Sequence, residues 1–164
     1  MKNTLKYLFF ALVGLLIGSM ITAWHGDIPV EEIIEKYAYD NSQFLELDGM
    51  NVHYRINGHT GETVVLLHGT ASSLHTWEVW TNELSKHYRV VSFDLPGFGI
   101  TGPEPNGVYT RERYLEFIDD MLVKLNIDTC YMAGNSFGGY MTWSYAVAHP
   151  EKVKKIAILN SSGY

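Results

Sequence analysis

A Gly-x-Ser-x-Gly sequence, residues 134–138, is the part of this chain whose residue types and spacing best suit covalent chemistry. An apolar run of strand character that starts at Cys130 precedes it, and a long apolar-striped segment follows. This order predicts a tight strand-to-helix turn that holds the Ser136 hydroxyl above the sheet. Gly134 and Gly138 stand where side chains would collide with the neighbouring strand and helix. Since the pattern alone arises by chance in about one chain of this size in ten, its surroundings matter.

Two further motifs lie upstream, and each directly follows an apolar run that reads as a buried strand. Both are short loops that contain glycine. They are His68-Gly69-Thr70, after the run 63–67, and Asp94-Leu95-Pro96-Gly97-Phe98-Gly99, after the run 89–93.

Segments of strand and helix character alternate around these motifs. We expect an antiparallel hairpin with strands 44–47 and 52–56, buried strands over 63–67 and 89–93, and a last strand over 155–159. The expected helices are one with Trp77, Trp80 and Leu84 on one stripe, one from an N-cap at Thr110 to about Asn126, and one that ends at His149-Pro150. The alternation predicts an α/β fold with a mostly parallel sheet and helices on both faces.

The composition suits a globular domain. The chain has 164 residues, of which 46% are hydrophobic and 18% charged, which is not typical of disorder. The formal net charge is −6 and no basic stripe is visible, so we expect no nucleic-acid partner. Cys130 is the only cysteine, and we assign it a core-filling role. The sequence shows no metal-ligand cluster, and we predict no metal and no cofactor.

The first 24 residues stand apart from the rest. Lys2 and Lys6 precede an uncharged apolar run over 7–24, long enough for the ~20 residues that cross a bilayer. Ile21 stands where signal-peptide cleavage requires a small residue. We therefore favour an uncleaved anchor that contacts the lipid bilayer through residues 7–24 over the cleaved signal of a secreted protein. The lysines predict a single-pass protein whose domain lies outside the cytoplasm.

Taken together and in this order, the three motifs resemble the N-terminal part of an α/β-hydrolase. The resemblance covers residues 43–164, which we interpret as a partial α/β-hydrolase domain without the family's C-terminal strands and lid. Residues 1–24 would be the anchor or signal segment. Residues 25–42 would be a linker, in which Pro29 can start a short amphipathic helix.

The resemblance implies that Ser136 is the nucleophile. It also implies that the backbone N–H groups of Thr70 and Phe137 form the oxyanion hole, where the loss of one donor costs about 2.7–4 kcal/mol. Because the family's triad acid and histidine follow the serine, the remaining loop residues are expected to be structural: His68, Gly69 and Asp94.

The chain departs from the family pattern after Ser136. Only one acid, Glu151, and one histidine, His149, follow it. His149 would lie roughly 20 Å away along the same helix at 1.5 Å per residue, so it cannot take the serine proton, and Glu151 lies further still. We therefore expect these residues to be the front portion of a longer hydrolase, with the triad acid and histidine downstream and little activity of their own.

The leading functional reading is a membrane-anchored serine hydrolase that acts on an ester or similar small acyl substrate. One alternative is a carbon–carbon bond hydrolase, because the Gly-Asn-Ser-x-Gly-Gly sequence at 134–139 resembles family members with that activity. Another is a non-catalytic binding domain whose serine has lost its partners. Haloalkane dehalogenases and epoxide hydrolases are disfavoured because they carry aspartate where Ser136 stands.

Overall fold

The computed structural model describes residues 2–24, 26 and 28–163, and the chain divides into two compact units, Met1–Glu35 and Lys36–Tyr164. The first unit contains helix α1 (Lys2–Ala23). Its span Asn3–Ala23 is long and apolar enough to cross a membrane, and none of it is buried. A signal sequence near an N-terminus meets the same criterion.

Helix α2 (Val30–Tyr37) begins directly after Pro29, as expected. The Pro29 carbonyl accepts hydrogen bonds from the N–H groups of Glu32 and Ile33 at 3.1 and 3.3 Å.

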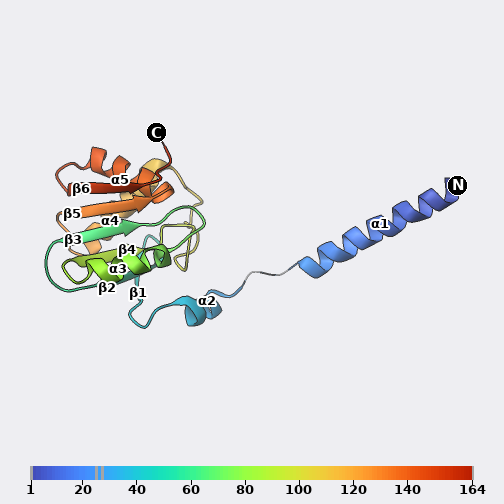
Figure 1. The fold of residues 1–164 in the computed structure, drawn as a ribbon, viewed down its shortest axis with the longest axis horizontal. Helices are drawn as coiled ribbons and strands as arrows, with labels where there is room; N and C mark the ends of the chain where they lie inside the picture. The colour runs from blue at the N-terminus through green and yellow to red at the C-terminus, as the bar shows by residue number, and fades with distance from the viewer. Residues whose placement is uncertain (1, 25, 27, 164) are drawn as a thin grey trace. The chain divides into compact units, whose positions relative to one another are not determined.

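A six-stranded sheet forms the centre of the second unit, with the order β1-β2-β4-β3-β5-β6 (Figure 1). The strands are β1 (Gln43–Leu47), β2 (Met50–Asn57), β3 (Thr63–Leu67), β4 (Arg89–Phe93), β5 (Cys130–Asn135) and β6 (Val153–Leu159). Strand β2 pairs antiparallel with β1 and β4, whereas the β3–β4, β3–β5 and β5–β6 pairs are parallel. The predicted hairpin and mostly parallel sheet are confirmed, and β6 begins two residues before the predicted position.

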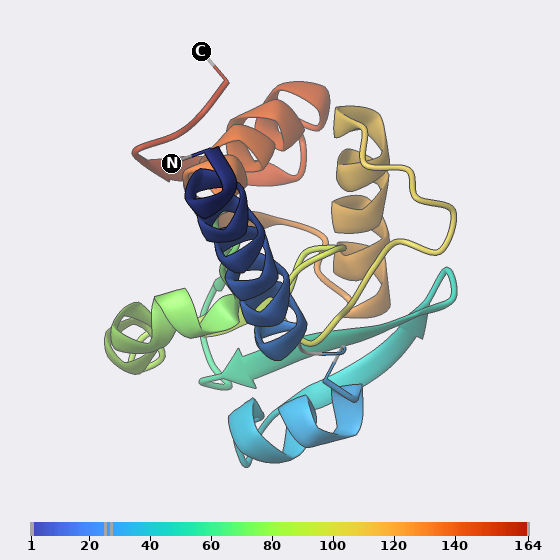
Figure 2. The same cartoon turned by 90° about the vertical axis from the view of Figure 1, so that its right-hand side faces the viewer.

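Helices cover both faces of this sheet. Helices α4 (Arg111–Lys124) and α5 (Phe137–Ala148) lie side by side on one face, and the 3-10 helix η1 (Leu74–Trp77) and α3 (Glu78–Leu84) lie on the other (Figures 1 and 2). Neighbouring residues of β3 show why the strand is apolar throughout. Val65 packs in the core under α4 and α5, Leu66 packs in the core under η1, and both are 0% exposed.

Two helix expectations have different outcomes. The side chain of Thr110 accepts a hydrogen bond from the Arg113 N–H at 3.2 Å, which confirms the predicted N-cap of α4. Trp77 and Trp80 do contact each other, with ring centroids 5.7 Å apart, but only Trp77 lies in the core, because Trp77 is 1% exposed and Trp80 is 42% exposed. Trp80 borders a part of the sheet near β6 that no described helix covers, beside Ile156.

Candidate active site

Ser136 occupies a strained turn between β5 and α5. Its φ and ψ are 53° and −116°, a combination that residues with side chains rarely adopt. Its N–H donates to the Leu159 carbonyl at 3.0 Å, and its carbonyl accepts from the N–H groups of Tyr140 and Ser162 at 3.0 and 3.1 Å. The backbone is thus held firmly while the side chain does not cap α5. The expected strand–turn–helix with Ser136 in a sparsely allowed conformation is confirmed.

Gly134 and Gly138 allow the elements around this turn to approach one another. A Cβ atom on Gly134 would lie 2.2 Å from the carbonyl oxygen of Gly138, and one on Gly138 would lie 2.1 Å from that of Leu67. The positive φ belongs to Ser136 and to neither glycine. Space, rather than an unusual dihedral angle, therefore requires glycine at both positions.

The loop after β3 passes directly against Ser136. A Cβ atom on Gly69 would lie 3.1 Å from the Ser136 Cβ and 3.7 Å from its Oγ. Thr70 follows in this loop, and Phe137 is the first residue of α5, where N–H groups have no partner within the helix. Thr70 and Phe137 line one cavity of about 310 Å³. The structure thus brings together the two residues that the resemblance implies as oxyanion donors.

The rest of this cavity is largely aromatic. Its other walls are Pro96, Gly97, Phe98, Tyr109 and Tyr114. The Tyr114 hydroxyl donates to the Pro96 carbonyl at 2.9 Å, and burial raises the pKa of Tyr114 to about 12. Tyr114 therefore stays neutral at physiological pH, and the cavity suits an uncharged, apolar group.

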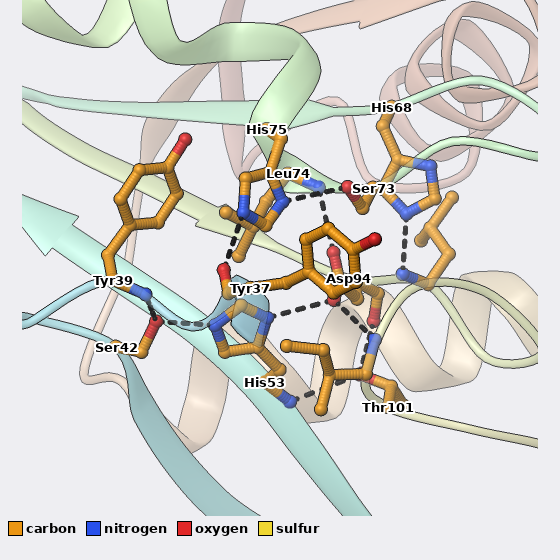
Figure 3. A network of polar contacts seen from close by, with 12 residues as sticks. Tyr37, Tyr39, Ser42, His53, His68, Ser73, Leu74, His75, Asp94 and Thr101 are labelled. Carbon is orange, nitrogen blue, oxygen red and sulfur yellow. Dashed lines mark hydrogen bonds and ion pairs between the residues drawn. The ribbon is translucent and has the colours of Figure 1, made fainter. Parts of the chain in front are cut away.

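His68 joins the loop after β3 to the loop after β4 (Figure 3). Its Nε2 accepts from the Leu95 N–H at 2.9 Å, so its Nδ1 carries the proton and donates to the Gly69 carbonyl at 2.8 Å. Burial lowers the pKa of His68, which keeps the ring neutral. Both nitrogens are occupied by backbone groups, so this geometry leaves neither to Ser136.

Asp94, which is 0% exposed, holds several segments at once. Its Oδ1 accepts from the Leu74 N–H at 2.7 Å, and its Oδ2 contacts the Ile100 N–H and His53 Nδ1, each at 2.9 Å. Burial alone would raise the pKa of Asp94, but the hydrogen bonds, led by that from His53, outweigh it and lower the pKa. Asp94 is therefore an ionised brace of its loop, and these bonds all go to groups other than Ser136.

The two groups that follow Ser136 in sequence lie at the far end of α5. His149 is the C-cap of this helix, whereas Ser136 is the N-cap, and the 12 helical residues between them span about 18 Å. Nδ1 of His149 lies 3.7 Å from Glu151 Oε1. The sequence-based exclusion of both groups as partners of Ser136 is confirmed by this geometry.

The other described histidines are also occupied or distant. His53 and His75 have both ring nitrogens hydrogen-bonded to groups other than Ser136. His59 and His87 precede β3 and β4, at the opposite edge of the sheet from Ser136. Across residues 2–24, 26 and 28–163, therefore, no imidazole contacts the Ser136 hydroxyl. In the same ranges no group of three or more side chains is arranged to hold a metal ion.

Comparison with known proteins identifies the family. A family model described as alpha/beta hydrolase fold matches residues 62–163. The chain belongs to the α/β-hydrolase fold family. It is 34% identical over 107 residues to the 2-hydroxy-6-oxo-2,4-heptadienoate hydrolase of Pseudomonas putida, covering 63% of this chain and 38% of that protein. It is 32% identical over 114 residues to human epoxide hydrolase 4, covering 68% and 32%.

A solved structure supports the same fold. The meta-cleavage product hydrolase of Pseudomonas fluorescens IP01 superposes with a TM-score of 0.69 at 28% identity, covering 74% of this chain and 45% of that one. These family relatives are hydrolase enzymes. The chain spans between about a third and just under half of their length.

Proposed function

We propose that this chain carries the nucleophile of a serine hydrolase that cleaves an ester or similar acyl bond. The observation that supports it is the strained turn, which holds Ser136 Oγ against Gly69 beside the cavity lined by Thr70 and Phe137. Ser136 would attack the acyl carbonyl carbon, and the N–H groups of Thr70 and Phe137 would stabilise the oxyanion. Loss of the leaving group would give an acyl-enzyme, which water then hydrolyses.

The proposal needs a base, because a serine hydroxyl is a poor nucleophile without one. We propose that the imidazole and its acid partner are supplied by polypeptide beyond these 164 residues. Two observations support this. No described imidazole contacts Ser136, and the chain covers only part of its relatives' length. By itself the chain would keep at most the residual ~10³–10⁴-fold rate over water that an oxyanion hole and binding provide.

Carbon–carbon bond hydrolysis is the second candidate. It is supported by the 34% identity to a protein named as a 2-hydroxy-6-oxo-2,4-heptadienoate hydrolase, together with the Gly-Asn-Ser-Phe-Gly-Gly sequence of the turn. Epoxide hydrolysis is not proposed. Although one relative is named as an epoxide hydrolase, a serine and not a carboxylate stands at the turn.

The proposal places the enzyme at a membrane. Helix α1 would act as an uncleaved anchor in the lipid bilayer, supported by its length and apolar composition. The lysines at its start favour a cytoplasmic N-terminus and an extracytoplasmic hydrolase domain.

The test is chemical rescue of the missing base. Added imidazole should accelerate labelling of Ser136 by a fluorophosphonate in a concentration-dependent way, with the adduct located by peptide mass spectrometry. Ser136→Ala should abolish that adduct, whereas Ser85→Ala, on the far side of the sheet, should label like the wild type. A folded chain without an adduct at Ser136, with or without imidazole, would instead support a binding domain. The rate of p-nitrophenyl ester hydrolysis is then compared with the rate of carbon–carbon bond cleavage in a dienoic diketone acid. This comparison distinguishes an ester hydrolase from a carbon–carbon bond hydrolase.

A further inference from the structure

A hydrogen-bonded series of a serine, a histidine and an aspartate lies away from the strained turn. Ser42 Oγ is 2.7 Å from His53 Nε2, and His53 Nδ1 is 2.9 Å from Asp94 Oδ2. Figure 3 shows the three side chains in line, from the segment before β1, from β2 and from the loop after β4. None of the roles proposed for Ser136 uses this chain of contacts.

The proton positions in the Ser42–His53–Asp94 series follow from the groups at its two ends. Asp94 also accepts backbone N–H bonds on both carboxylate oxygens and is ionised, so it can only accept from His53. The Nδ1 of His53 therefore carries a proton, and in the neutral form of the ring Nε2 is an acceptor. In that form the Ser42 hydroxyl donates to Nε2, while its oxygen accepts the Tyr39 N–H at 2.9 Å.

Two of the three residues are fully buried and the third, Ser42, is half-buried. His53 and Asp94 are both 0% exposed, and the ring of Phe44 stacks on His53 with centroids 5.1 Å apart. Ser42 is half-buried, so it is the member of the three nearest to solvent. The hydroxyl of a half-buried serine is thus backed by an imidazole that a buried carboxylate orients, the arrangement that makes a serine hydroxyl nucleophilic.

An arginine holds the segment that carries this serine. Arg55 and His53 point to the same face of β2 because strand side chains alternate. Arg55 Nε donates to the side-chain oxygen of Asn41, the residue before Ser42, at 2.9 Å. The guanidinium also lies 3.6 Å above the ring centroid of Tyr39. Its Nη1 also donates to Glu78 Oε2 at 2.8 Å, so this charge is paired, and Arg55 holds the segment before Ser42 in place.

We propose that Ser42 is a second nucleophile, separate from Ser136, that accepts small activated acyl or phosphonyl groups. With a fluorophosphonate, the Ser42 Oγ–phosphorus bond forms, the phosphorus–fluorine bond breaks, and fluoride leaves. The hydroxyl proton passes to His53 Nε2, and the imidazolium is stabilised by Asp94. With an activated ester the same transfer gives acyl-Ser42 and releases the alcohol or phenol.

The protein contains a matched comparison for this site. Ser73 Oγ lies 2.9 Å from Nδ1 of His75, but the other ring nitrogen of His75 faces the Tyr37 carbonyl oxygen at 2.8 Å instead of a carboxylate. Ser73 is likewise half-buried. The two sites therefore differ in the buried charge behind the histidine, and also in the burial of the ring, because His53 is 0% exposed whereas His75 is half-buried.

The experiment is to react the full chain, and its Ser136→Ala variant, with a fluorophosphonate and to measure the adduct on each serine over time by peptide mass spectrometry. We expect Ser42 to react about 10²-fold faster than Ser73, because only the histidine behind Ser42 is oriented by a carboxylate, whose loss costs a serine protease about 10⁴-fold. The Ser136→Ala variant should keep the Ser42 adduct, so the outcome is independent of the function proposed for Ser136.

Variants test the role of the histidine. Ser42→Ala should remove this adduct alone, and His53→Gln should lower the Ser42 rate to that of Ser73 or below it, with folding checked by circular dichroism. A Ser42 rate equal to that of Ser73 in the wild-type chain would overturn the proposal even if His53→Gln fails to fold. So would an unchanged Ser42 rate in a folded His53→Gln variant.

Discussion

Gly69 lies against Ser136 so closely that a Cβ atom on Gly69 would stand 3.1 Å from the Ser136 Cβ and 3.7 Å from its Oγ. The neighbouring residue Thr70 carries the backbone N–H that we propose as an oxyanion donor. The close contact between Gly69 and Ser136 thus fixes the distance between the Ser136 hydroxyl and the Thr70 N–H.

Gly69→Ala should therefore disturb the proposed site more than the fold. The added methyl group must push the loop or the serine aside, and a displacement of about 1 Å can cost about 10²-fold in rate. We expect the imidazole-rescued labelling of Ser136 to slow by about 10- to 100-fold. Gly18→Ala, where no atom lies within 4 Å of the added Cβ, is the control. Labelling of Gly69→Ala at the wild-type rate would argue against a fixed loop.

Gly138→Ala should act on stability instead. Its Cβ would stand 2.1 Å from the Leu67 carbonyl oxygen, a backbone atom of the central strand β3 that has no rotamer with which to escape. Overpacking of this kind costs about 1–3 kcal/mol and occasionally more, and we expect the upper end. Urea denaturation should show a lower midpoint with little change in slope. An unchanged midpoint would mean that α5 can move away from β3 at no cost.

Local sequence signals predicted most of the fold. Thr110 predicts the start of α4, because a helix needs a side-chain acceptor at its first turn. The apolar run at 63–67 predicts β3, because both faces of this strand are covered. The turn at Ser136 was predicted from Gly134 and Gly138. These two positions must lack a side chain for the strand and the helix to approach each other. Each of these signals lies within a few residues of the feature that it predicts.

Contacts between distant segments were not predicted. The pairing of His53 with Asp94 depends on the register of β2 beside β4, where the Asp94 N–H also donates to the His53 carbonyl at 2.9 Å. No property of His53 in the sequence signals that partner. The exposure of Trp80 was missed for the same reason, because it depends on what covers the sheet near β6.

The brace at Asp94 should make stability fall in acid. Its folded-state pKa lies below the ordinary value of 3.8, so its contribution is complete above that value and is lost as the pH falls through the folded pKa. Asp94→Asn should lower the free energy of unfolding at pH 7 by about 3–5 kcal/mol, the cost of breaking a buried pair.

Below about pH 3.8, the difference between the wild type and Asp94→Asn should shrink. The measurement is urea denaturation at several pH values. Asp128→Asn is the matched control because Asp128 is exposed. A difference that stays constant from pH 7 to strongly acidic pH would show that the charge of Asp94 does not matter.

Removal of residues 2–23 should release the protein from membranes. The segment Asn3–Ala23 has the length and apolar composition of a spanning helix, and ~20 apolar residues are needed to cross the hydrocarbon core. The full chain should therefore sediment with membranes and resist extraction by alkaline carbonate, whereas the shortened chain should not. N-terminal sequencing distinguishes the two explanations for this segment. An intact N-terminus in the membrane fraction supports an anchor, and a mature chain that starts near Trp24 supports a cleaved signal. A full-length chain in the soluble fraction would contradict both.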